Sequence, residues 1–134
     1  MPFTINQSTN YRSIEIVWTW TANGAGAVAS EDVPNGFKLT GYCVGIAADP
    51  GSTAPTDNYD VTVTDENGVD VLGGNGANLD TANSEYRPAL SYNAVDGVNV
   101  TEPPLIVNQG LTFNLSGNSV AAATGVISFR GIKV

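Results

Sequence analysis

The chain has 134 residues, a net charge of −8 and 13% charged residues, and it contains no histidine. This length suits one domain with a sizeable core. The five Lys and Arg residues are scattered, so binding to nucleic acid or to an anionic membrane is not expected. The lack of histidine excludes Ser-His-Asp and Cys-His catalysis and histidine-containing zinc sites. A carboxylate pair or a carboxylate metal site remains possible, but we expect neither an enzyme nor a bound cofactor.

Residues 1–12 are polar and are expected to form an N-terminal arm or an edge strand. Phe3 and Ile5 are the only large apolar residues between Met1 and Tyr11, which makes them candidates for an arm that lies across a neighbouring subunit. The alternative is an edge strand of the same domain. No basic region followed by an apolar stretch is present, so a signal peptide is not predicted. No apolar run reaches the roughly 18 residues of a membrane span.

Residues 13–134 are expected to form a single β domain, and its clearest strand is Ser13–Thr21, SIEIVWTWT. Apolar and polar residues alternate there with a period of two, and β-branched and aromatic residues prevail. One face should carry the core anchors Ile14, Ile16, Trp18 and Trp20.

The next predicted strand runs from about Phe37 to Ala47. Gly41 and Gly45 interrupt it, and glycine at such positions favours β-bulges. Cys43 is the only cysteine, so no intrachain disulfide can form. Its alternating neighbours, GYCVGIA, favour an inert core residue over a reactive thiol.

The stretch YDVTVTDENGVDVLGG, residues 59–74, joins two alternating runs through Asn67 and Gly68. An EF-hand loop needs glycine at its sixth position and glutamate at its twelfth, and this stretch does not fit. Asn-Gly between two strands instead predicts a hairpin with a type I′ turn, in which both residues take positive φ. A tight turn is therefore favoured over a calcium site.

The remaining segments also predict strands and turns. The long loop 73–88 should include a short helical turn near 79–85, and 95–101 should form a strand. Residues 105–116 should form a hairpin that turns at 108–110, and 125–134 should close the domain as an apolar strand. This spacing predicts an all-β fold, an antiparallel β-sandwich or a small jelly-roll-like barrel, in a single domain.

Two further groups of residues are candidate sites. Asp57 and Asp60 could form a carboxylate pair, but nothing near them in the sequence would raise a pKa, so solvated loop charges are favoured. Tyr86 and Tyr92 could stack on sugars, although aromatic loop residues more often pack locally.

Three stretches together resemble a group of small virion proteins of tailed bacteriophages, of the head decoration (cement) or head-fibre-like type. They are IEIVWTWTANGAGAV, DPGSTAPTDNYDVTVTDENGVDVLGGNGANLDTANSE and LTFNLSGNSVAAATGVISFRGIKV. The central block, 49–85, is the specific part, and the C-terminal block resembles the group more loosely. Residues 91–104 are individual to this chain.

The resemblance implies a capsid decoration protein that is made in the host cytoplasm and binds the outer surface of the phage head, with the major capsid protein as its partner. It also implies a homotrimer. No catalytic residues come with the resemblance. The alternative is a tail or fibre-associated virion component, which could be a carbohydrate-binding module that contacts the host.

Overall fold

The computed structural model describes residues 2–8, 12–92, 99–100 and 102–134. Within them the secondary structure consists of strands and turns, with no helix that is long and apolar enough to span a membrane. The strands are β1 (Phe3–Gln7), β2 (Ser13–Thr21), β3 (Glu31–Asp32), β4 (Leu39–Pro50), β5 (Asp60–Thr64), β6 (Glu85–Pro88), β7 (Ser91–Tyr92), β8 (Asn99–Val100), β9 (Leu105–Gln109), β10 (Thr112–Ser116) and β11 (Thr124–Lys133).

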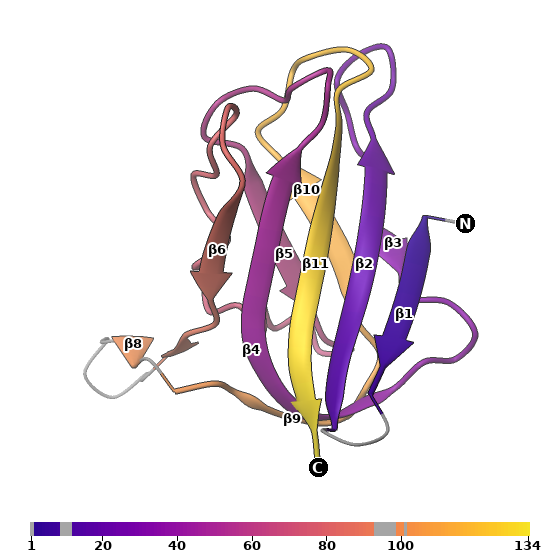
Figure 1. Cartoon of the computed structure of the whole chain (residues 1–134), viewed down its shortest axis with the longest axis vertical. Coiled ribbons are helices and arrows are strands. Elements are labelled where there is room, and N and C mark those ends of the chain that lie inside the picture. Colours follow the sequence, from indigo (N-terminus) through magenta and orange to yellow (C-terminus); the bar gives the residue numbers. More distant parts are fainter. Residues whose placement is uncertain (1, 9–11, 93–98, 101) are drawn as a thin grey trace.

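The strands form two antiparallel sheets that pack face to face (Figure 1). The larger sheet has the order β1-β2-β11-β4-β6, and β9 also pairs with β4. The smaller sheet has the order β3-β10-β5 and lies behind the larger one in Figure 1. A separate short ladder joins β7 to β8. The predicted all-β class is confirmed, and of the two predicted architectures the structure has the sandwich.

β2 supplies the centre of the core, as its alternation predicts. Its four inward side chains are at most 2% exposed, and they are Ile14, Ile16, Trp18 and Trp20. The Trp18 ring packs edge-on against Phe113 of β10 with ring centroids 5.6 Å apart, and Phe113 packs in the same way against Phe129 of β11 at 6.1 Å. Each such pair adds about 0.5–1.5 kcal/mol beyond the burial of apolar area.

Residues Phe3–Gln7 form the edge strand β1, which pairs with β2 from Phe3↔Trp18 to Gln7↔Ile14. The Phe3 side chain is 8% exposed and stacks on Trp18 at 6.4 Å, whereas Ile5 is half-buried. Within the described part of 1–12, Phe3–Gln7 thus form an edge strand of the same domain.

β4 contains the predicted irregularities. Its register shifts against β11 between Arg130 and Gly131, opposite Gly45 and Cys43, and it shifts against β9 between Leu39 and Gly41. Gly45 is required by space, because a Cβ there would lie 2.4 Å from the Arg87 carbonyl oxygen. Cys43 is fully buried, and burial raises the pKa of its thiol to about 12, which agrees with an inert core residue.

The predicted hairpin over 105–116 is wrong. β9 pairs with β4 in the larger sheet, whereas β10 pairs with β5 and β3 in the smaller one. The chain changes sheets at the predicted turn, where Asn108 has a φ of 51°. Local residues indicated a turn, but they do not determine which strands pair on either side of it.

Of two other predictions, the helical turn near 79–85 is wrong, and most of the strand 95–101 lies outside the described residues. The segment near 79–85 is not helical: Leu79 forms a β-bridge with Tyr59, and the Asp80 carboxylate accepts N–H groups of the bend that follows. Of the predicted strand 95–101, only Asn99–Val100 lies within the described residues, as β8. In the segment 79–85, the hydrogen bonds of the Asp80 side chain thus favour a bend over a helical turn.

Asn67 and Gly68 lie in a tight turn, as predicted, but its type is different. The Gly68 N–H donates to the Asp65 carbonyl at 3.0 Å, and φ is 79° at Gly68 while Asn67 does not take a positive φ. This is a type I turn followed by a left-handed glycine. The Asp65 Oδ1 atom accepts the N–H groups of Asn67 at 2.9 Å and Val69 at 3.0 Å, which favours this type over I′.

Replacing Gly68 with Val should lower the free energy of unfolding by about 1–2 kcal/mol, because a β-branched residue resists positive φ. A Cβ at Gly68 meets nothing within 4 Å, so the cost comes from the backbone alone. Gly24→Val is the matched control: its Cβ also meets nothing within 4 Å, and its φ is not positive. Chemical denaturation of both variants measures the difference, and equal stabilities would contradict the left-handed assignment.

Candidate interaction surface

Large apolar side chains that remain exposed gather at one end of the larger sheet. Ile132 of β11 lies opposite Tyr42 of β4, and Tyr42 lies opposite Leu105 of β9. Paired residues point to the same face of a sheet, so these three side chains form one row on the outer face. Val107 lies two residues beyond Leu105 and Val134 two beyond Ile132, on the same face.

We call this set the apolar band: Tyr42, Leu105, Val107, Ile132 and Val134. Their exposed fractions are 39%, 52%, 61%, 46% and 62%. Apolar residues that are scattered singly over a surface are normal, but a contiguous group marks an interaction site.

A groove of about 530 Å³ continues the apolar band around the side of the sandwich. Leu105, Val107 and Val69 line this groove, and Val69 is 57% exposed. Asp65, Asp70 and Gln109 also line the groove. The band and the groove together hold every large exposed apolar residue of the described chain except Tyr86.

The acidic residues near the groove are already occupied by backbone N–H groups. Asp70 Oδ1 accepts from Val63 and Leu72 at 3.1 Å each, and Oδ2 accepts from Gly74 at 2.9 Å. Asp65 caps its own turn, as described above. Across the described residues, no group of three or more His, Cys, Asp or Glu could hold a metal ion. The hydrogen bonds of Asp65 and Asp70 hold the 65–70 turn, whose residue Val69 lines the groove.

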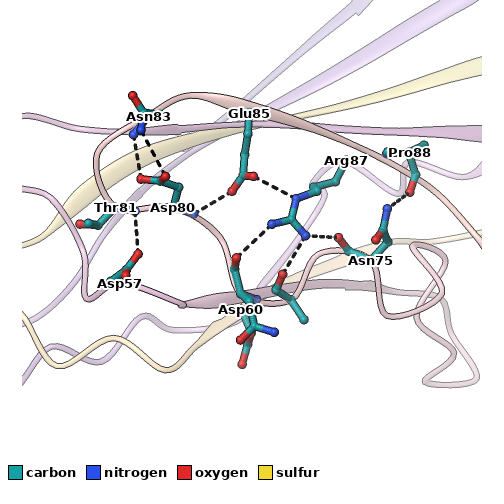
Figure 2. Close-up of polar contacts among 11 residues, drawn as sticks. Asp57, Asp60, Asn75, Asp80, Thr81, Asn83, Glu85, Arg87 and Pro88 are labelled. Carbon is teal, nitrogen blue, oxygen red and sulfur yellow. Dashed lines mark hydrogen bonds and ion pairs between the residues drawn. The ribbon is translucent and has the colours of Figure 1, made fainter.

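The long loop 73–84 is tied down by Arg87 of β6, as Figure 2 shows. The guanidinium Nη1 donates to the carbonyls of Ala77 at 2.9 Å and Asn75 at 3.3 Å, and Nη2 donates to Asn78 at 3.0 Å. The Nε atom donates to Glu85 at 3.0 Å. Sequence reasoning missed this role, because the carbonyl acceptors lie on a loop without regular pattern.

Asp57 and Asp60 also hold this loop. The Asp60 Oδ1 atom accepts the Asn78 N–H at 2.8 Å. The Asp57 Oδ1 atom accepts the Thr81 N–H at 3.4 Å, as Figure 2 shows. These contacts give both carboxylates a structural role in holding the loop.

Of the two candidate sugar-stacking tyrosines, the structure describes the side chain of Tyr86 only. Tyr86 lies on β6 and is 45% exposed, and its hydroxyl donates to the Val44 carbonyl at 3.2 Å. The side chain of Tyr92 lies outside the described residues. Tyr86 is thus a single exposed ring that is anchored to the neighbouring strand.

Comparison of the chain with models of protein families, with curated proteins and with solved structures found no match.

Arg87→Lys should lower the free energy of unfolding by about 2 kcal/mol, because an ammonium cannot span three carbonyls and a carboxylate. Arg130→Lys is the matched control, since Arg130 is 52% exposed and its Nε lies 3.6 Å from Glu15. That exposed pair should change stability by less than about 0.5 kcal/mol. Urea denaturation compares the two variants, and equal losses would contradict the clamping role.

Asp80→Ala should lower the melting temperature at pH 7, because the carboxylate accepts N–H groups of Ala82 and Asn83. These hydrogen bonds, that from Ala82 first, lower the pKa of Asp80 below its ordinary value of 3.8. A group with a lowered pKa in the folded state stabilises the fold above the unfolded pKa and loses this effect as pH falls through the folded pKa. The gap between wild type and variant should therefore shrink below pH 3.8. A gap that stays constant down to acid unfolding would contradict this.

Proposed function

We propose that this protein is a structural virion protein, a capsid decoration (cement) protein that binds the outer surface of a bacteriophage head and stabilises it. The observation that carries the proposal is the apolar band, a contiguous exposed surface on the larger sheet. The resemblance of the block 49–85 to phage head decoration proteins supports it independently.

The apolar band is suited to contact with a preformed protein surface. Full burial of a Val, Leu or Ile side chain contributes about 1.5–3 kcal/mol, so each half-exposed member of the band adds about 1 kcal/mol when covered. One copy would bind weakly on this basis. A homotrimer, which the resemblance implies, would engage the repeated sites of a shell with several bands at once and bind much more tightly.

The charged residues support a protein partner over nucleic acid or membrane. Three of the five basic side chains are already paired: Lys38 with Glu66, Arg87 with Glu85, and Arg130 with Glu15. Net charge is −8, which opposes approach to phosphates. The proposed partner is the major capsid protein, and the proposed location is the capsid surface of the virion after synthesis in the host cytoplasm.

The test mixes purified protein with capsids of the corresponding phage that were assembled without it. Wild-type protein should co-sediment with the capsids and raise the temperature at which they release DNA, since binding favours the assembled shell. The double variant Leu105→Ser/Ile132→Ser should bind at least tenfold more weakly. Tyr86→Ser, which removes an exposed ring outside the band, is the matched control and should bind as wild type does.

Two results would contradict the proposal. One is protein that stays in the supernatant while antibody labelling of virions places it on the tail, which would favour the tail or fibre-associated component. The other is equal capsid binding by the double variant and wild type, which would exclude the band as the contact. A gene position among tail genes rather than beside the major capsid gene would point the same way as tail labelling.

A further inference from the structure

We infer that β1 is a contact between two copies of this chain. In this contact the β1 strands of two copies pair antiparallel across a two-fold axis that passes beside Ile5. The larger sheet then continues from one copy into the other. The inference is independent of the proposed function and rests on the hydrogen bonding, the composition and the surroundings of β1.

The register of β1 fixes which of its backbone groups face outward. At the two ends of the β1–β2 ladder, the Thr19 N–H donates to the Pro2 carbonyl at 2.8 Å, and the Ser8 N–H donates to the Ser13 carbonyl at 3.0 Å. Hydrogen-bonded positions alternate along an antiparallel ladder. Thr4 and Asn6 therefore bond to β2. The N–H and C=O groups at the other positions point away from the sheet, and these positions are Phe3, Ile5 and Gln7.

The other edges of the two main sheets carry features that block pairing. β3 has two residues, both acidic, and β6 has four residues that include two charges and Pro88. β9 is irregular because its register shifts against β4. β5 is covered by the following loop, where the Val61 N–H donates to Gly76 and the Val71 N–H donates to Val63.

β1 has none of these features. It has five residues, FTINQ, with no charge and no proline, and its register with β2 is continuous. It lies at the margin of the larger sheet (Figure 1). A regular, uncharged edge is a template for a further strand.

A second copy of β1 fits this edge because the outward positions are symmetric about Ile5. An antiparallel partner centred there places Ile5 opposite Ile5 and Phe3 opposite Gln7, so that each outward N–H and C=O meets its complement. Ile5 is half-buried at the margin of the core, and the second Ile5 would cover it further. Because the contact is isologous, it closes on itself and gives a pair rather than a fibre.

Electrostatic repulsion between the two copies makes this pairing depend on the salt concentration. Each copy carries −8, and Glu31 and Asp32 of β3 lie behind β1 on the same side of the sandwich. Two copies therefore repel at low ionic strength, and added salt screens this repulsion. The association should strengthen as salt rises, which is the opposite of a contact held by ion pairs.

The two-fold contact is distinguishable from a trimer contact by copy number. Alone it gives dimers, and combined with a trimer contact it gives assemblies with an even number of copies, such as hexamers. Loss of the β1 contact halves the copy number in either case. The experiment therefore compares masses and does not need a capsid.

Sedimentation velocity of the full chain, over a range of protein concentrations and at low and high salt, is the test. Gln7→Pro removes an outward N–H without removing a bond to β2, and proline is tolerated on edge strands. Gln7→Ala removes the same side chain, whose Oε1 accepts from Lys133, but keeps the N–H. We expect wild type and Gln7→Ala to form even-numbered assemblies, and Gln7→Pro to show half their copy number.

Ile5→Lys serves as a second variant if Gln7→Pro does not fold, since it places two like charges opposite each other at the axis. Near-ultraviolet circular dichroism confirms that each variant is folded. A wild type that stays monomeric at all concentrations and salts would overturn the inference. So would a folded Gln7→Pro or Ile5→Lys variant with the wild-type copy number, or a wild-type trimer.

Discussion

The burial of Trp18 between the two sheets is the contact on which the rest of the structure depends. Its ring touches Phe3 of β1 and Phe113 of β10, and its Nε1 atom donates to the Glu31 carboxylate of β3 at 3.2 Å. One side chain of β2 thus contacts a strand of its own sheet and two strands of the smaller sheet. These contacts hold β1 and β2 of the larger sheet against β3 and β10 of the smaller sheet.

Much of the fold could be predicted from the sequence, because the signals were local. Alternation located β2 and β5, and glycines located the bulges of β4. The pairing partner of each strand was harder to predict, since it depends on contacts between distant segments. The strands β9 and β10 illustrate this: the sequence predicts a break between them near Gly110, yet they belong to different sheets.

The candidate surface could not be predicted for the same reason. Tyr42, Leu105 and Ile132 are far apart in the sequence, and each alone is an ordinary outward residue of a strand. They become a surface only because the sheet order places β4 between β9 and β11. The Arg87 contacts could not be predicted either, because their acceptors are backbone carbonyl groups, which every residue has.

The place of β11 in the larger sheet has a consequence for biosynthesis. β11 pairs on both sides, with β2 and with β4, yet it follows every other described strand in the sequence. During synthesis on the ribosome, the edges of β2 and β4 that pair with β11 therefore stay unpaired until Thr124–Lys133 has emerged. The contacts that close the sheet join the most distant segments, which makes this step slow. A product that stops before Thr124 has no strand to fill the gap, so translation must proceed through β11 before the sandwich can close.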